Sequence, residues 1–261
     1  MKTSISNDVL TKAINSVRTK NPLVHNITNS VVMNNSANAL LAIGASPVMT
    51  HWAEEIKSMV AIADALVINI GTLDNILINS AKIAGAEAHR IGTPIIFDPV
   101  GAGATKQRTQ ASWEIINHCK PTVIRGNASE IMALVDADVK SKGVDSNALS
   151  SDALESAKSL AIKTGAVVVI SGTTDYITNG SDVHIVDGGD IIMTKVTGMG
   201  CTATAIIGAF AAIEKDPMIA ATAAMASMSL AGERAASKAY GNGSMQMHFL
   251  DELYNLNSVN L

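Results

Sequence analysis

Two glycines could form a binding turn for phosphate: Gly198 and Gly200, which flank Met199 and are followed at once by Cys201. The small apolar residues of 203–214 predict a helix directly after this turn. Glycine has no Cβ, so its N–H group is open to a ligand, and the free amides and dipole of a helix N-terminus attract anions. The alternative is a strand-to-helix turn that needs glycine only for tightness, and the two glycines alone do not decide between them.

Carboxylate and amide side chains follow two apolar segments. Asp98 comes after residues 94–97, and Asn127 and Glu130, three residues apart, come after Arg125. Oxygen ligands of this kind hold Mg²⁺ directly or through water, and a guanidinium binds phosphate oxygens. Structural alternatives exist for each group. Asp98 can cap a turn, and Asn followed three residues later by Glu is the pattern of a capping box, which is the better explanation when the pair is taken alone.

A third polar segment, residues 25–29, has the sequence His-Asn-Ile-Thr-Asn and precedes an Asn- and Ser-rich stretch at 34–38. Buried amides with partners could orient a polar aromatic ligand, and Asn26 is the candidate for substrate binding in this segment. The alternative, slightly favoured from the residues alone, is that Asn26 or Thr28 caps an ordinary amphipathic helix.

The sequence lacks the motifs of several other enzyme classes. It contains no Gly-x-x-x-x-Gly-Lys-Ser/Thr, which excludes a P-loop, and no early Gly-x-Gly-x-x-Gly, which disfavours a dinucleotide enzyme. The six histidines include no His-x-x-x-His pair, and there is no Gly-x-Ser-x-Gly elbow. A zinc site and a serine hydrolase are therefore not expected.

Short β-branched runs alternate with helix-period segments along the chain. Strands are predicted at residues 65–71, 94–99, 122–126 and 166–172, with a shorter one at 46–49. Helices are predicted between them, for example at residues 76–91 and 148–164. Strands that are apolar throughout and alternate with helices indicate a parallel sheet that is buried on both faces.

One edge of this sheet is predicted to be antiparallel. The segment 175–180 ends in an Asn-Gly turn and is followed by the short apolar run 183–186, which indicates a hairpin. Neither a linker nor a repeat divides the chain, so we expect a single α/β domain over residues 1–261. Ligands of such sheets bind beyond the carboxyl ends of the strands, where Asp98, Arg125 and also Asn69 are expected to lie.

Composition excludes further classes of protein. The 261 residues are 48% hydrophobic, 16% charged and 3% aromatic, with a net charge of −4, so neither a disordered chain nor a nucleic-acid partner is expected. Two cysteines cannot build a disulfide framework. The N-terminus has no apolar leader, and charged residues at 214–216 interrupt the most apolar stretch, so we expect a cytoplasmic protein with no membrane partner.

Six motifs taken together resemble the hydroxyethylthiazole kinase family. They extend from about residue 20 to about residue 215 in the order that the family has them. The motifs are NPLVHNITN at 21–29, GASPVM at 44–49, NIGTL at 69–73, DPVGAGA at 98–104, RGNASE at 125–130 and VTGMGC at 196–201.

This resemblance implies a ribokinase-like fold, a three-layer sandwich with a mainly parallel central sheet, helices on both faces and a short antiparallel edge. It also implies that ATP, with Mg²⁺, phosphorylates the hydroxyl of 4-methyl-5-(2-hydroxyethyl)thiazole, a salvage step toward thiamine. The family is homotrimeric, with the thiazole pocket between subunits. Carried over by motif, the implied roles are Met49 for the thiazole, Gly198 for the substrate side of the anion hole, Arg125 and Ser171 for ATP, and Asn127 and Glu130 for Mg²⁺, with Asp98 near the phosphates. From the residues themselves, Gly200 is expected in the same turn as Gly198, and Asp98 is a further candidate for Mg²⁺.

Cys201 lies where the broader superfamily usually has an Asp that acts as base, and the thiazole kinases resemble this sequence in carrying Cys. A helix N-terminus can lower the pKa of a thiol, but a thiol ionised at neutral pH is a poor base for an alcohol. Phosphoryl transfer depends mostly on positioning and charge stabilisation. We therefore expect the amides of the turn and Mg²⁺ to dominate, with Cys201 assisting or shaping the pocket. Met199, where relatives commonly have Ala, and Ser171, where Thr is common, depart from the pattern.

Other functions stay open at this point. A ribokinase-like kinase for another alcohol, such as hydroxymethylpyrimidine, would share the fold and the phosphate turn. A thiazole- or nucleotide-binding protein without turnover is a second alternative, which the presence of Asp98, Asn127 and Glu130 disfavours. A sheet protein that binds no nucleotide is a third, and it requires the glycine turn to be purely structural.

Overall fold

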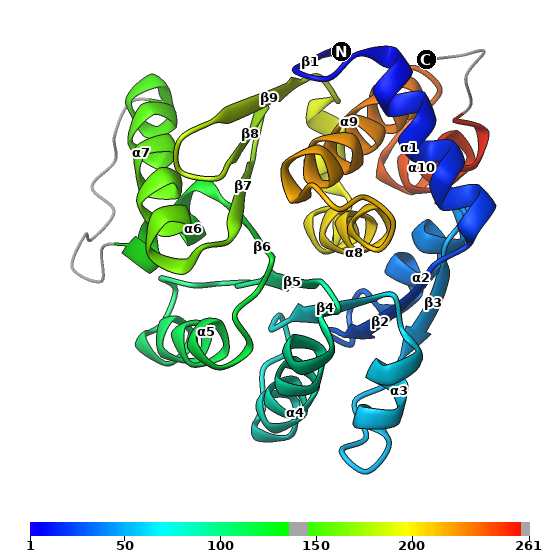
Figure 1. Ribbon diagram of the computed structural model, residues 1–261. Helices are drawn as coiled ribbons and strands as arrows, with labels where there is room; N and C mark the ends of the chain where they lie inside the picture. Colours follow the sequence, from blue (N-terminus) through cyan, green and yellow to red (C-terminus); the bar gives the residue numbers. More distant parts are fainter. Residues whose placement is uncertain (136–145, 257–261) are drawn as a thin grey trace.

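The computed structural model describes residues 1–135 and 146–256, and its strands join into one nine-stranded sheet in the order β1-β9-β8-β7-β6-β5-β4-β2-β3 (Figure 1). Strands β3, β2, β4, β5, β6 and β7 are parallel, and β8, β9 and β1 add an antiparallel edge. The strands are β1 Lys2–Thr3, β2 Leu23–Ile27, β3 Ser46–Met49, β4 Ala65–Asn69, β5 Ile95–Asp98, β6 Val123–Asn127, β7 Val167–Ser171, β8 Thr174–Thr178 and β9 Val183–Asp187.

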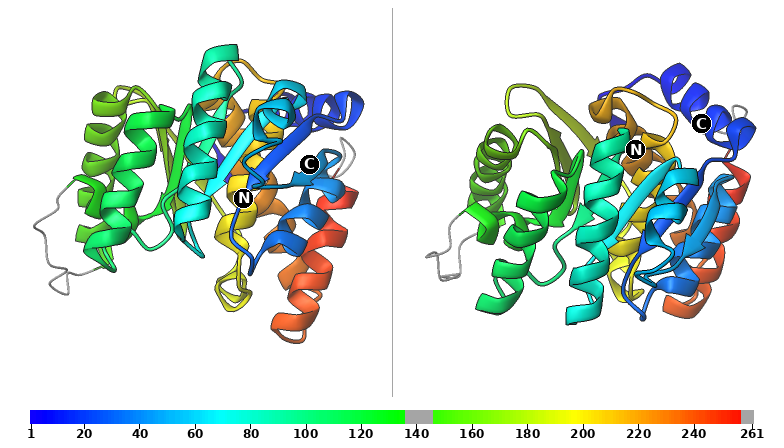
Figure 2. Two further views of the ribbon diagram at one scale, coloured as in Figure 1. Left: turned by 90° about the horizontal axis from the view of Figure 1, so that it is seen from below. Right: turned by 60° about the horizontal axis from the view of Figure 1, so that its bottom comes forward.

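Helices cover both faces of the sheet. Those of the first face are α1 Asn7–Lys20, α2 Met33–Ile43, α8 Met199–Ala211, α9 Pro217–Ala236 and α10 Asn242–Asn255. Those of the second face are α3 Ile56–Ile62, α4 Asn75–Ile91, α5 Lys106–Cys119, α6 Ala128–Val135 and α7 Ser146–Thr164. A 3-10 helix, η1, spans Ile191–Lys195. Figure 2 shows the two groups of helices and the sheet from two further directions.

Successive residues of the buried strands belong to different hydrophobic cores. In β7, Val167 and Val169 pack in the core of the first face, whereas Val168 and Ile170 pack in the core of the second. Because side chains alternate across a strand, a strand with helices on both sides is buried on both faces and is therefore mostly apolar. This confirms the three-layer arrangement, the predicted strands and the predicted hairpin. The extent of the domain, residues 1–261, stays a prediction.

The prediction that Asn26 or Thr28 caps the following helix is wrong. Asn26 lies within β2, between β3 and β4, and does not cap a helix. The N-cap of α2 is Val32, which makes no side-chain capping hydrogen bond. The sequence pattern does not predict this strand, because the polar residues His25 and Asn26 interrupt its apolar run.

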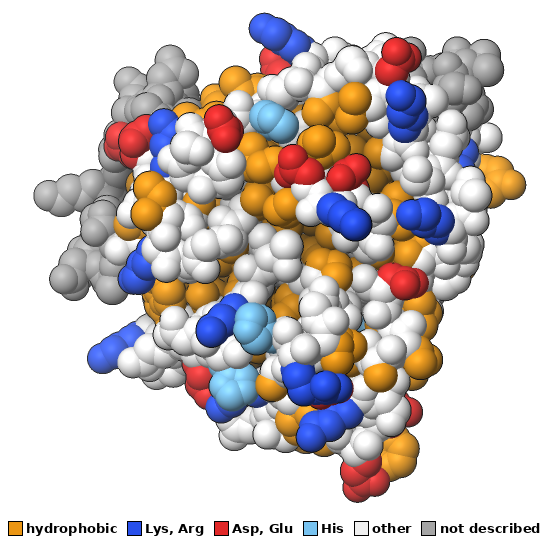
Figure 3. All heavy atoms as spheres, in the orientation of Figure 1, with side chains coloured by type: hydrophobic (Ala, Val, Ile, Leu, Met, Phe, Trp, Pro, Cys, Tyr) orange, Lys and Arg blue, Asp and Glu red, His pale blue; other side chains and the backbone are white. Residues whose placement is uncertain are grey.

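The surface carries no continuous basic stripe on the face that Figure 3 shows, where Lys and Arg side chains are scattered among acidic ones. Among the helices that the structure describes, none is both long and apolar enough to cross a membrane.

Candidate functional site

The glycine turn begins α8 earlier than the sequence predicts. Gly198 is the N-cap, with a left-handed φ of 82°, and the helix starts at Met199, so that Gly200 and Cys201 lie in its first turn. The expected start at residue 203 is therefore wrong. A Cβ at position 200 would lie 2.6 Å from Nη1 of Arg125, so the guanidinium would have to move away from the turn. Gly200 thus lets the Arg125 guanidinium approach the amides of the first helical turn.

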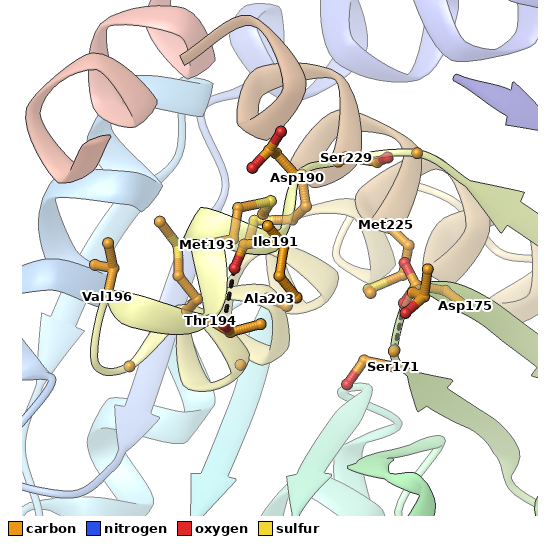
Figure 4. Close-up of a pocket in the computed structure, with 18 of the residues that line it drawn as sticks. Ser171, Asp175, Asp190, Ile191, Met193, Thr194, Val196, Ala203, Met225 and Ser229 are labelled. Atoms are coloured by element: carbon orange, nitrogen blue, oxygen red, sulfur yellow. Dashed lines mark hydrogen bonds between the residues drawn. The ribbon is translucent and has the colours of Figure 1, made fainter. Parts of the chain in front are cut away.

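A cavity of about 680 Å³, within the range of small-molecule sites, opens at this turn (Figure 4). Its walls come from the end of β7, the start of β8, the segment that contains η1, the first turn of α8 and the middle of α9. Four predicted site residues line it together with Met199. These residues are Arg125, Ser171, Gly198 and Gly200.

Arg125 joins this cavity to Asp98 behind it. Its Nη2 donates a hydrogen bond to Ser171 Oγ, and its Nη1 lies 3.6 Å from Asp98 Oδ2. Asp98 is fully buried, and burial raises the pKa of its carboxyl to about 6, an effect that the neighbouring positive charge of Arg125 only partly offsets. The site therefore places a buried carboxyl directly beside the guanidinium that lines the cavity.

Asp98 belongs to a buried hydrogen-bond network. Its Oδ2 accepts hydrogen bonds from Asn69 Nδ2 at 2.8 Å and from Thr204 Oγ1 at 2.7 Å. Asn29 Nδ2 donates to Asn69 Oδ1 at 2.7 Å and lies 3.5 Å from Cys201 Sγ. The network joins the carboxyl ends of β4 and β5 to the first turns of α8. It fixes the side chains around Cys201 before any ligand binds.

The sequence reasoning did not assign a site role to Thr204 or Asn29. Thr204 is a polar residue in a segment of small apolar residues, and it comes one turn after Cys201, which is a usable signal for a residue on the same face of the helix. Asn29 lies in the amide-rich segment that the sequence singled out as a whole.

The pKa of the Cys201 thiol is raised, mainly by burial and further by the negative charge of Asp98. Hydrogen bonds from Asn69 and Asn29 and the charge of Arg125 act in the opposite direction and are weaker. The lowering that a helix N-terminus can cause is thus not realised here. The thiol stays protonated at neutral pH, which agrees with an assisting or shaping role for it.

Glu130 and Asn127 form the capping box that the sequence allowed. Asn127 N donates to Glu130 Oε2 at 2.8 Å, and Glu130 N donates to Asn127 Oδ1 at 2.9 Å. Glu130 Oε1 also accepts a hydrogen bond from Gly101 N at 2.9 Å, so this carboxylate ties the turn after β5 to the start of α6. Glu130 is buried and lies close enough to raise the pKa of Asp98.

The donor set here fits a hydrated divalent cation. Asp98 Oδ1 is buried and has no hydrogen-bond partner among the described residues, which leaves one carboxylate oxygen free. Among the residues that the structure describes, no group of three or more His, Cys, Asp or Glu side chains could hold a metal ion by itself. Mg²⁺ suits such a place, because it usually keeps several waters and takes one or two carboxylates together with phosphate oxygens.

Two predicted substrate residues do not line the cavity beside Arg125; they lie near the edge of the sheet that β3 forms. Asn26 and Met49 are paired in register on β2 and β3, and β3 is the edge strand. Asn26 Nδ2 donates to Val24 O at 2.8 Å, whereas its Oδ1 is buried without a partner in the described structure. The structure therefore brings these two residues together but does not place them in the cavity that Arg125 lines.

Comparison with solved structures identifies the fold. A ribokinase-like superfamily protein from Enterococcus faecalis V583 matches with a TM-score of 0.69 over 97% of this chain and 96% of that chain, at 16% identity. The agreement shows a shared fold. The chain therefore has the fold of the ribokinase-like class.

The chain belongs to the hydroxyethylthiazole kinase family, whose model matches residues 14–258. A hydroxyethylthiazole kinase from Leptospira biflexa serovar Patoc is 55% identical over 242 residues, which are 93% of this chain and 91% of that protein. The hydroxyethylthiazole kinase protein from Pyrococcus horikoshii OT3 has a solved structure that matches with a TM-score of 0.89 at 41% identity, covering 96% of this chain and 94% of that one. The expected family and fold are thereby confirmed.

Proposed function

We propose that this protein transfers the γ-phosphoryl group of ATP to the hydroxyl of 4-methyl-5-(2-hydroxyethyl)thiazole, a step of thiamine biosynthesis or salvage. One observation carries the proposal beyond family membership: the cavity beside Arg125 and Ser171 ends at the open amides of α8, next to buried Asp98. A triphosphate in the cavity would point its terminal phosphate at these amides.

In this proposal, the residues of the chain mainly position and stabilise charge. Arg125 and Ser171 bind phosphate oxygens, and the N–H groups of the first turn of α8 bind the group in transfer. Asp98 and Glu130, with Asn127, hold Mg²⁺, which neutralises phosphate charge when it is bound. Asn127 and Glu130 serve this purpose mostly by orienting water, since their oxygens are already engaged with backbone N–H groups.

For the thiazole side we propose Met49 and Asn26, in a homotrimer whose pockets lie between subunits. Met49 is half-buried on the edge strand, where a neighbouring subunit can complete its surroundings. Trp52, just after this strand, and Ile62, at the end of α3, are 60% and 65% exposed. Large exposed apolar side chains of this kind, aromatic ones above all, are typical of subunit contacts. The cytoplasmic location remains a prediction from the sequence.

The experiment measures ADP release from the purified protein with Mg-ATP, with and without the thiazole alcohol. We expect release that depends on the thiazole and disappears without Mg²⁺ and in Glu130→Gln. The matched control is Glu114→Gln, which removes the same charge from an exposed ion pair with Lys82 and should leave the rate unchanged.

Thermal unfolding of both variants shows whether Glu130→Gln is folded. If the wild type releases ADP with hydroxymethylpyrimidine but not with the thiazole, hydroxymethylpyrimidine replaces the thiazole as the proposed substrate. ATP binding without release for any alcohol would indicate a nucleotide-binding protein.

A further inference from the structure

We propose that Asp175 binds a ribose hydroxyl of the nucleotide and so makes the enzyme prefer ribonucleoside over deoxyribonucleoside triphosphates. The inference rests on the proposed function, because it assigns a part of the same cavity to the sugar of ATP. It adds a residue that determines specificity and that lies outside the motifs singled out in the sequence.

Asp175 is the second residue of β8 and lines the cavity. Its Oδ1 accepts a hydrogen bond from Gly172 N at 3.0 Å, and the described structure offers its Oδ2 no hydrogen-bond donor. The side chain is half-buried, and burial raises the pKa of its carboxyl to about 6. At neutral pH the cavity therefore contains a carboxylate with one oxygen that is free to accept hydrogen bonds.

The chemistry of the two partners limits what this oxygen can bind. A carboxylate only accepts hydrogen bonds, and the phosphates of ATP also only accept, so they repel each other. The donors that ATP offers are the two ribose hydroxyls and the exocyclic amine of the base. Asp175 must therefore face the nucleoside part of ATP.

Position along the cavity wall selects the sugar over the base. Asp175 comes four residues after Ser171, whose Oγ accepts a hydrogen bond from Arg125, and the charge of Arg125 acts on Asp175. Figure 4 shows Asp175 between Ser171 and Met225. Further along, Met193, Met225 and Met228 supply an apolar lining that suits a flat base. Phosphate, sugar and base then follow one another from Arg125 toward the methionines.

A second carboxylate lines the same cavity and provides a matched control. Asp190 is exposed, and its Oδ1 accepts a hydrogen bond from Ile192 N as the N-cap of η1. In Figure 4 Asp190 is drawn above Met193, whereas Ser171 is drawn below Asp175. Asp190 therefore carries the same charge in the same cavity but lies away from the expected place of the sugar.

The test compares kcat/KM for ATP, 2′-deoxy-ATP and 3′-deoxy-ATP in the wild type, Asp175→Ala and Asp190→Ala. A hydrogen bond to a charged acceptor predicts that the wild type prefers ATP over at least one deoxy analogue by roughly tenfold to a hundredfold. We expect this preference to fall to within about twofold in Asp175→Ala and to stay unchanged in Asp190→Ala.

A purely structural role for Asp175, through its bond to Gly172, would lower kcat/KM for all three nucleotides and leave the preference intact. That result would overturn the inference, as would a wild type without preference. Inosine triphosphate tests the base: if Asp175→Ala changes the ratio of ATP to inosine triphosphate instead, the carboxylate faces the exocyclic amine and the sugar assignment is wrong.

Failure of the inference can be told apart from failure of the proposed function. If no turnover depends on the thiazole, the same three nucleotides are compared by calorimetric binding to the three proteins, without any acceptor alcohol. The ratio of their dissociation constants tests Asp175 directly. Circular dichroism and thermal unfolding confirm that both variants are folded.

Discussion

Two neighbouring regions of the site differ in how densely hydrogen bonds link their polar side chains, although Oδ1 of Asp98 is itself without a partner in the described structure. Around Asp98, the side chains of Asn69, Thr204 and Asn29 are linked by short hydrogen bonds, and almost all of them are buried. Along the cavity wall, Asp175 has one free carboxylate oxygen, and the Ser229 hydroxyl is buried without a partner in the described structure.

The difference separates a preformed reaction centre from a surface that is completed by its ligand. A buried network of linked hydrogen bonds is rigid, and it holds charges where they stabilise a transition state without reorganisation. A wall with free polar atoms gains its missing hydrogen bonds from the ligand. We therefore expect substitutions in the network to change kcat and stability, and substitutions in the wall to change mainly KM and nucleotide preference.

The largest effect is expected from Asp98→Asn. The amide keeps an acceptor for Asn69 and Thr204 but removes the charge that faces Arg125 and the proposed cation. Loss of one preorganised electrostatic group predicts a fall in kcat of about a hundredfold to a thousandfold. Steady-state kinetics with saturating Mg-ATP check this, and an unchanged kcat would place the reaction centre elsewhere.

The same variant tests the burial of Asp98 through the pH dependence of stability. Because the pKa of Asp98 is raised to about 6 in the folded protein, the folded state holds this proton more tightly than the unfolded chain. The contribution of the carboxyl is fully favourable below pH ~4 and is lost as the pH rises through ~6.

Asp98→Asn lacks this titration. Its free energy of unfolding should therefore rise relative to the wild type, by up to about 3 kcal/mol, between pH 4 and pH 7. Urea unfolding of both proteins across this range measures the difference. A difference in the free energy of unfolding that does not change with pH would show that burial does not raise the pKa of Asp98.

Cys201 should give a smaller effect on kcat. Its thiol is protonated at neutral pH, so Cys201→Ala should reduce activity by about tenfold at most, short of the loss of ~10²–10⁴ expected for a general base. Cys201→Asp should keep or raise activity, since a carboxylate near Asp98 becomes a proton acceptor with a raised pKa. Rates and thiazole binding are measured together, and a total loss in Cys201→Ala with binding intact would make the thiol indispensable.

Met199 on the cavity wall should give the smallest effect. It is half-buried at the start of α8 and lines the cavity, where its side chain is large for this turn. Met199→Ala should change KM for ATP or the thiazole by less than about tenfold and leave kcat near that of the wild type. A large fall in kcat would instead place Met199 with the network of the reaction centre.

Most strands could be predicted because a buried parallel strand has a distinctive sequence. The predicted strands 65–71 and 166–172 begin with the apolar runs 65–68 and 166–170, and they correspond to β4 and β7 in the interior of the sheet. Strand β2 was not predicted, because it contains the buried polar residues His25 and Asn26. Burial of such polar side chains depends on hydrogen-bond partners elsewhere in the fold, such as Thr50 O, which lies 2.9 Å from His25 Nε2.

The site was predicted in part. The motifs placed Arg125, Ser171, Gly198 and Gly200 in one site, and the structure brings them to one cavity. Asp175 could not be recognised, because its place in that cavity follows from the hairpin that returns β8 along β7. No local pattern distinguishes it from the many aspartates that begin or cap elements of structure.

By itself the sequence determined the alternation of strands and helices, the family, and the residue types that we propose for phosphate and cation binding. These features depend on local periodicity and on short motifs. Only the tertiary structure decided that the Asp98 carboxyl would be fully buried with a raised pKa, and that Cys201 would share its network. The reason is physical: a pKa depends on desolvation and on charges nearby in space, and these come from segments that lie far apart in the chain.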